Sequence, residues 1–240
     1  MLSKAIRKEI KKILPAYKHA KTSYSQEGED MIINRFLEHK DKGVYVDVGA
    51  HHPFRFSNTA FFYKKGWSGI NIDPLPSAAP LFKKYRKRDI NIQKGVSLEA
   101  KQLTYYSFNE PAYNTFDATK AKEYVDAKLV KPDVKKIQID TVPLRTILDE
   151  NLVPGTTIDF LSIDTEGLEM EVLQSNNWEK YQPTIIILES HFIEVEKFFN
   201  SPLHLFMKDL GYTVVAKSYY SYFYKKTSYD LKNALDQSSN

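Results

Sequence analysis

The chain has 240 residues, a net charge of +4 at neutral pH and no cysteine. This length suits one large α/β domain, and the lack of cysteine excludes disulfides, thiolate metal sites and a thiol nucleophile. Residues 1–21 carry a net charge of +6, so the rest of the chain is close to neutral and gives no support to nucleic-acid binding. No apolar run is long enough to span a bilayer and no secretory signal is evident, so we expect a cytoplasmic protein.

Residues 2–14 predict a basic amphipathic helix, with leucine and isoleucine on one face and lysine on the other. We favour a helix that docks on its own domain or on a second subunit in a homo-oligomer. The alternative is a peripheral contact with the inner face of the membrane, because basic amphipathic helices bind anionic lipid surfaces.

Apolar periodicity predicts alternating helices and strands through the next part of the chain. Ser23 and Gln26 stand at the spacing of a capping box. The predicted elements are helix 27–38, strand 44–48, helix 57–66, strand 68–72, helix 75–86 and strand 90–94. This βαβαβ order implies a parallel sheet. The basic run at residues 83–88 is assigned to the solvated face of its helix.

Residues 98–136 are an insertion with a strand at 103–108, a polar stretch at 109–115 and a helix at 117–129. Insertions of this kind often carry substrate contacts. The later elements are strand 137–142, helix 144–150, strand 157–163, helix 167–174, strand 184–188, helix 193–209 and two closing strands within 211–226. We therefore predict one α/β domain over residues 22–240, with a doubly wound Rossmann-like sheet that is mostly parallel and closed by an antiparallel strand.

Two turns at the ends of neighbouring strands suggest a nucleotide site. Asp47 lies in a strand that runs into Gly49, and the next strand ends at Asp73, 24 residues beyond that glycine. The turn lacks the second and third glycines of a dinucleotide motif, and Pro53 removes a backbone donor, which disfavours an NAD-linked oxidoreductase. There is no P-loop either.

S-adenosylmethionine fits these turns better, because it has a ribose but no phosphate. Asp47 can face the amino-acid end of this ligand, Gly49 lets the chain pass close to it, and Asp73 can accept hydrogen bonds from the ribose hydroxyls. The segment after the third strand could flank the adenine, and its candidates are Gly95, Val96 and Ser97. The alternative is that the two aspartates only cap loops.

Four segments resemble the FkbM-type family of S-adenosylmethionine-dependent methyltransferases. They are residues 23–30, residues 45–51 continued by 57–59, residues 66–74, and residues 158–169 continued by 172–173 and 183–189. The family usually has Asp-Gly or Asn-Gly where this chain has His52-Pro53. Residues 1–21 and 98–136 match nothing in the family pattern.

The resemblance implies a class I methyltransferase fold and O-methylation of a hydroxyl, often on a sugar of a glycan, lipopolysaccharide or glycosylated metabolite. Such enzymes commonly serve polysaccharide biosynthesis. It also implies that residues of these segments surround the cofactor: Ser25, Gln26, Asp47, Gly49, Ala50, Asn58, Asp73, Pro74 and Asp164.

Methyl transfer to a hydroxyl needs a group that takes the proton, and the ends of the central strands offer candidates. Asp164 is the first choice, with Glu189, His51 and His191 as further catalytic candidates. The alternatives are that Asp164 caps the following helix and that the histidines only bind loop backbone. Asp164, Glu189 and a histidine would also suit Mg²⁺ or Mn²⁺, but no ligand-spacing motif supports a metal and none is assigned.

A hypothesis of another class remains open. The chain could be a catalytically inactive binding module that keeps the fold and docks a partner or membrane through residues 2–14. Binding of the cofactor product without methyl transfer would favour that alternative.

Overall fold

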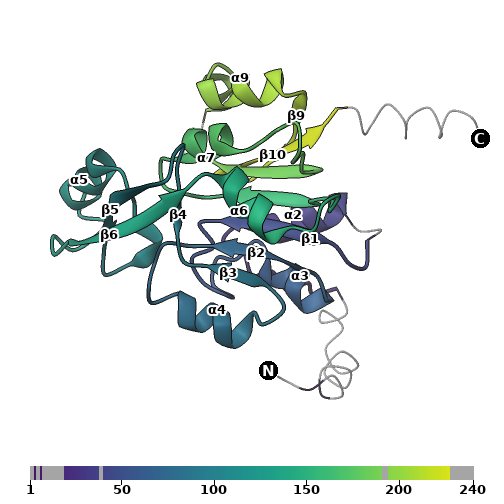
Figure 1. Ribbon diagram of the computed structural model, residues 1–240, viewed down its shortest axis with the longest axis horizontal. Helices are drawn as coiled ribbons and strands as arrows, with labels where there is room; N and C mark the ends of the chain where they lie inside the picture. The colour runs from purple at the N-terminus through teal and green to yellow at the C-terminus, as the bar shows by residue number, and fades with distance from the viewer. Residues whose placement is uncertain (1–2, 4–5, 7–18, 38–39, 191–193, 228–240) are drawn as a thin grey trace, which may run out of the picture.

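The computed structural model describes residues 3, 6, 19–37, 40–190 and 194–227 (Figure 1). The predicted helix at residues 2–14 lies outside the described residues, apart from two isolated positions, and so does His191. Among the helices that are described, none combines the length and the apolar character needed to cross a membrane.

The main sheet has seven strands in the order β3-β2-β1-β7-β8-β10-β9. The first five strands of this order are parallel, whereas β10 pairs antiparallel with both β8 and β9. The strands are β1 (Val44–Val48), β2 (Ser68–Ile72), β3 (Ile90–Ile92), β7 (Phe160–Ile163), β8 (Ile185–Glu189), β9 (Tyr212–Lys217) and β10 (Ser221–Lys226). The predicted mostly parallel Rossmann-like sheet with an antiparallel closing strand is thereby confirmed.

Helices cover both faces of this sheet, because its central strands carry apolar side chains on both sides. Helices α2 and α3 pack on the face that carries Tyr45 and Phe160, and α6 to α9 pack on the face that carries Val46 and Leu161. The helices are α2 (Glu29–Phe36), α3 (Ala60–Lys65), α4 (Ala79–Tyr85), α5 (Ala118–Asp126), α6 (Leu144–Asn151), α7 (Glu169–Ser175), α8 (Val195–Phe199) and α9 (Pro202–Asp209).

Two local predictions were wrong. The predicted helix 193–209 is two helices, since Pro202 begins a new one and the Ser201 hydroxyl caps it by accepting a bond from the His204 N–H at 3.3 Å. The predicted capping box does not form. Instead, buried Asp30 accepts bonds from the Ser23 hydroxyl at 2.6 Å and the Tyr24 N–H at 2.7 Å, and so fixes the loop that precedes α2.

The insertion forms a second sheet in the order β4-β6-β5, which extends with α5 to the left of the main sheet in Figure 1. Its strands are β4 (Gly95–Val96), β5 (Lys101–Ser107) and β6 (Lys135–Val142), and a short 3₁₀ helix, η2 (Pro111–Tyr113), follows β5. The predicted strand 90–94 ends at Ile92, and the chain then leaves the main sheet for the second one.

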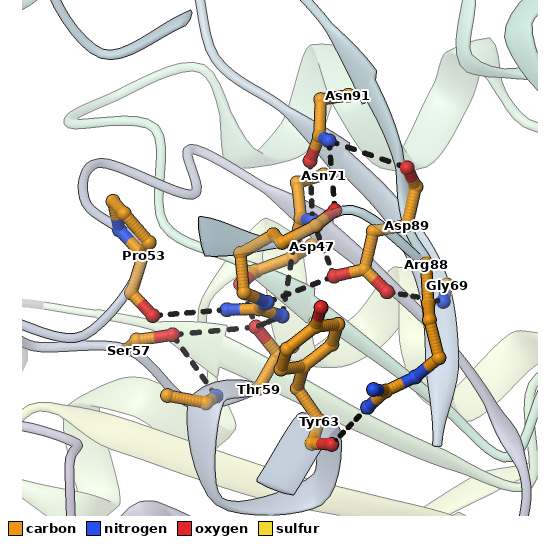
Figure 2. A network of polar contacts seen from close by, with 12 residues as sticks. Asp47, Pro53, Ser57, Thr59, Tyr63, Gly69, Asn71, Arg88, Asp89 and Asn91 are labelled. Atoms are coloured by element: carbon orange, nitrogen blue, oxygen red, sulfur yellow. Dashed lines mark hydrogen bonds and ion pairs between the residues drawn. The ribbon is translucent and has the colours of Figure 1, made fainter. Parts of the chain in front are cut away.

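A buried polar network lies beneath the turn that follows β1 (Figure 2). Its centre is Arg86, which is 0% exposed and forms an ion pair with Asp89 at 2.8 Å. The same guanidinium donates to the Pro53 carbonyl at 3.1 Å and to the Thr59 hydroxyl at 2.9 Å, and Thr59 in turn donates to Asp47 at 2.9 Å. The assignment of residues 83–88 to a solvated face is therefore wrong for Arg86, which links helix α4 to the turn.

Gly49 allows an unusually close approach between β1 and β7. Its φ is +84°, and a Cβ placed there would lie 1.6 Å from the carbonyl oxygen of Asp164. The amide of Asp164 donates to the Val48 carbonyl at 3.0 Å, which holds the two strand ends together. The glycine is therefore needed for the neighbouring strand as well as for the turn.

We expect Gly49→Ala to lower the free energy of unfolding by more than about 4 kcal/mol, because a Cβ collides with backbone that cannot move without breaking the sheet. The matched control is Gly155→Ala. Gly155 has φ +83° but nothing within 4 Å of its Cβ position, so only the backbone strain of about 1–2 kcal/mol should appear. Denaturant titration measures both values, and equal losses would contradict the steric argument.

We also expect Arg86→Met to lower the free energy of unfolding by about 3–5 kcal/mol, since it leaves Asp89 buried without its cation. Lys87→Met, at an exposed position one residue away, should change this free energy by less than about 0.5 kcal/mol. Thermal or denaturant unfolding of the two variants measures the difference, and a stable Arg86→Met protein would show that the network is dispensable.

Candidate active site

A crevice opens at the carboxyl ends of the central strands, where open α/β sheets bind ligands. Its wall includes many predicted site residues: Gln26, Gly49, His51, Asp73, Pro74, Gly95, Val96, Asp164 and Glu189. The insertion supplies the facing side through Tyr105, Asn114 and Phe116. The topology therefore brings together residues that are more than 100 positions apart in the sequence.

Asp73 is held in place by backbone at the end of β2. One carboxylate oxygen accepts a bond from the Leu75 N–H at 2.8 Å, and the other accepts one from the His51 N–H at 2.7 Å. Burial raises the pKa of Asp73 to about 6, although the two N–H donors favour the charged form. Each oxygen retains acceptor capacity toward the crevice, as recognition of a diol requires.

His51 lies on the turn after β1 in a left-handed conformation, with φ 53°. Its ring stacks on Phe56 with centroids 6.2 Å apart, and its Nε2 atom is buried without a hydrogen-bond partner of ordinary geometry. Burial, reinforced by the charge of Arg55, lowers the pKa of His51 to about 4. The imidazole is neutral at pH 7, so it can hydrogen-bond a ligand but is a weak proton acceptor.

Asp164 and Glu189 form a carboxyl pair at the ends of β7 and β8. Their side chains are close enough to share a hydrogen bond, which requires one of them to be protonated. The Asp164 carboxyl is open to the crevice, but the surrounding protein raises its pKa to about 7, and the charges of Glu166, Glu169 and Asp47 act in the same direction. Burial and the charge of Asp164 raise the pKa of Glu189 well above its usual range. The pair therefore retains a proton near neutral pH, held mainly by Glu189.

One oxygen from each of Asp164, Glu166 and Glu189 lies within 4.8 Å of the others, which is the kind of cluster that can hold a divalent ion. Glu166 already accepts a hydrogen bond from the Tyr124 hydroxyl and lies 3.7 Å from the Lys120 ammonium. These two partners compete with an ion for Glu166. Mg²⁺ or Mn²⁺ therefore stays the untested alternative that the sequence did not favour, and we assign no metal ligand.

Other predicted cofactor residues do not line the crevice. Ser25 bonds Asp30, Ala50 packs against Ala78 and Phe82, and Ser97 is buried and bonds the Glu99 carbonyl and Thr141. Asp47 is 4% exposed and is held by the Thr59 hydroxyl, while Asn58 donates to Ser162 and faces a side groove. The side chains of Ser25, Ala50, Asp47 and Ser97 thus support the wall from behind, and His191 lies outside the described residues.

Sequence reasoning gave no site role to Asn114, Tyr105 or Phe116. Asn114 accepts a bond from the Phe108 N–H at 2.8 Å, and its buried Nδ2 atom has no partner of ordinary geometry. Tyr105 and Phe116 pack together on the crevice wall with centroids 4.7 Å apart. The only signal for these residues was the polar stretch at 109–115, which includes Asn114.

The residues present fit a nucleoside with a polar tail. His51, Asn114 and Glu189 each direct a buried polar atom without an ordinary partner to the wall of the same crevice, and Asp73 offers a fixed carboxylate. Buried polar groups are normally satisfied, so these atoms indicate a missing ligand or ordered water. Apolar side chains such as Leu75, Val96 and Phe116 can enclose a base.

Several solved methyltransferases resemble the fold at low identity. The 1,6-didemethyltoxoflavin-N1-methyltransferase of Burkholderia thailandensis, solved with S-adenosylhomocysteine, is 12% identical with a TM-score of 0.39, covering 82% of this chain and 75% of that one. An O-methyltransferase of Bacillus cereus, also in complex with S-adenosylhomocysteine, is 10% identical with a TM-score of 0.40, and covers 93% and 91%. A TehB-like S-adenosylmethionine-dependent methyltransferase of Corynebacterium glutamicum is 10% identical with a TM-score of 0.40, and covers 94% and 100%.

No curated protein matches the sequence. The family described as the methyltransferase FkbM domain matches residues 47–214, which is most of the chain and runs from the end of β1 through the insertion to β9. This match confirms the family resemblance, although the segment at residues 23–30 lies outside it, and supports S-adenosylmethionine as the cofactor. The chain therefore belongs to the FkbM family of methyltransferases.

Proposed function

We propose that this protein is an S-adenosylmethionine-dependent O-methyltransferase that methylates a sugar hydroxyl in a cell-surface glycan or a glycosylated metabolite. The family supports methyl transfer. The observation that carries the choice of a hydroxyl is the carboxyl pair of Asp164 and Glu189, which places a proton acceptor with a pKa of about 7 at the crevice. A hydroxyl needs such a base, because its proton must leave as the new bond forms.

The cofactor supplies an activated methyl group on a sulfonium. In our proposal Asp73 accepts hydrogen bonds from the ribose hydroxyls, while His51 and Asn114 satisfy their buried atoms on polar groups of the same ligand. Gly95 and Val96, which both line the crevice, are the residues we propose to lie beside the base. Asp47 acts at a distance from this ligand, through the turn that Thr59 and Arg86 support.

Asp164 is the proposed proton acceptor. The acceptor oxygen loses its proton to the Asp164 carboxylate while it displaces the sulfonium sulfur from the methyl carbon. Glu189, protonated beside it, stabilises the negative form of Asp164 through the shared hydrogen bond. General-base catalysis of this kind typically raises the reaction rate by about 10²–10⁴-fold. The rest of the rate acceleration comes from alignment of the acceptor oxygen with the methyl carbon.

We expect Asp73→Ala to weaken binding of S-adenosylhomocysteine by more than tenfold, because it removes the acceptor for the ribose and releases the His51 N–H. Isothermal titration calorimetry measures this change. Asp209→Ala, at an exposed position on α9, is the control and should bind like the unaltered protein. Equal affinities of the two variants for S-adenosylhomocysteine would contradict the assignment of Asp73 to the ribose.

We expect the rate of methyl transfer to rise with pH through about 7 and then level off, since Asp164 must be ionised to accept a proton. Asp164→Asn should lower the rate by about 10²–10⁴-fold and abolish this pH dependence. Incorporation of labelled methyl groups into a surface-glycan extract measures both effects. An unchanged pH profile in Asp164→Asn contradicts the assignment, whereas cofactor binding without any transfer by the unaltered protein favours the inactive binding module.

A further inference from the structure

We propose that a side groove next to the Asp164–Glu189 pair is the acceptor subsite, and that its charge restricts the acceptor to a sugar with no anionic group beside the reacting hydroxyl. This inference rests on the proposed function. The groove is continuous with the main crevice, because Gln26, Phe56 and the carboxyl pair line both. A compound in the groove therefore lies beside the proposed base.

Three segments that are distant in sequence build the groove. Glu27 and Glu29 come from the start of α2 and the loop before it, Asn58 comes from the loop before α3, and Tyr220 comes from the turn between β9 and β10. The carboxyl pair closes the inner end. Glu27 and Glu29 lie in the first family segment, but neither the resemblance nor the cofactor-binding predictions gave them or Tyr220 a role.

Hydrogen bonds hold Glu27 and Glu29, which we call the acidic wall of the groove, in defined positions. Glu27 accepts a hydrogen bond from the Tyr220 N–H at 3.1 Å. Glu29, which is 3% exposed, accepts one from the Ser218 hydroxyl at 2.8 Å and one from the Glu27 N–H at 2.8 Å. These bonds join the N-terminal loop to the β9–β10 turn, so the groove has a defined shape before any acceptor arrives.

The residues described along the groove include four carboxyl groups, from Glu27, Glu29, Asp164 and Glu189, and no lysine or arginine. The pair of Asp164 and Glu189 retains one proton, so it adds at most one negative charge. The nearby cations are engaged elsewhere. Lys217 donates to the carbonyls of Ser218 and Tyr219. Arg55 stacks on Phe56 but pairs with Glu110 at 2.9 Å. Lys120 lies 3.7 Å from Glu166, which is not a residue of the groove. An anionic acceptor would thus meet several like charges without a compensating cation.

A neutral or amino sugar suits the same surface. Its hydroxyls can donate to the carboxylate oxygens of Glu27 and to Glu189 Oε2, a carboxyl oxygen that is buried and receives no bond from an ordinary donor. The Tyr220 ring can cover an apolar face of a sugar, as aromatic side chains do in polar sites. An ammonium group would gain further from the carboxylates.

The test uses three methyl glycosides that differ in charge, derived from glucosamine, glucose and glucuronic acid. Each is titrated into the full-length protein saturated with S-adenosylhomocysteine, and binding is followed by ligand-observed NMR. We expect the glucosaminide to bind at least as well as the glucoside, and the glucuronide to bind at least tenfold more weakly.

Glu27→Gln tests whether the charge of the acidic wall causes the weaker binding of the glucuronide. The amide can still accept a hydrogen bond from the Tyr220 N–H but carries no charge. We expect it to reduce the discrimination against the glucuronide severalfold. Glu179→Gln is the control, because Glu179 is exposed and precedes β8, whereas the groove lies at the other end of that strand. A melting curve for each variant verifies that the fold is retained.

Two results overturn the proposal: equal or tighter binding of the glucuronide, or no binding of any of the three sugars to the complex. Unaltered discrimination in Glu27→Gln overturns the role of the acidic wall. Failure of the proposed function is detected separately, because S-adenosylhomocysteine would then give no binding heat in the absence of any sugar.

Discussion

The close contact between the ends of β1 and β7 determines where the chemistry of this site is placed. The carbonyl oxygen of Asp164 occupies the space that a side chain at position 49 would need, and the Asp164 amide is bound to the Val48 carbonyl. The Asp164 carboxyl is consequently held beside the turn that carries His51. We expected Gly49 to let the chain pass near a ligand, but its first requirement is the approach of a neighbouring strand. The proposed catalytic base is thereby positioned by backbone packing, which is more rigid than a loop.

The site concentrates negative charge, and only part of it is compensated within the protein. Arg86 is the one arginine or lysine that is fully buried in the described part of the chain, and it serves Asp89 and, through Thr59, Asp47. Desolvation by the surrounding protein raises the pKa of Asp47, Asp73 and Asp164 alike, although the charge of Arg86 opposes the rise at Asp47. A crevice of this kind favours a ligand with a positive charge, because the cation removes the cost of ionising the carboxylates. The sulfonium of S-adenosylmethionine meets that requirement.

Sequence patterns predicted the parallel strands of the main sheet well, because they are short apolar runs, and β1, β2 and β7 run directly into a glycine or an aspartate. The same patterns failed where structure depends on distant partners. The two-residue strand β4 is defined only by its pairing with β6. Arg86 points inward from a run of exposed basic residues, because its guanidinium forms an ion pair with Asp89 and a hydrogen bond with Asn71. Among site residues, the acids at strand ends could be predicted from position alone. Asn114 could not, since nothing in the polar stretch marks which of its polar side chains lines the crevice.

On our proposal, base strength and acceptor choice have a common origin. Like-charge neighbours and burial hold the pKa of Asp164 near neutrality, where a base is most effective at physiological pH. An additional negative charge in the groove would raise this pKa further and leave Asp164 protonated, so an anionic acceptor would disable the base that it needs. An ammonium group would have the opposite effect and favour the ionised base. The preference for acceptors without a negative charge then follows from the same electrostatic effects that set the pKa of Asp164. The acidic wall of Glu27 and Glu29 adds to this preference along the groove.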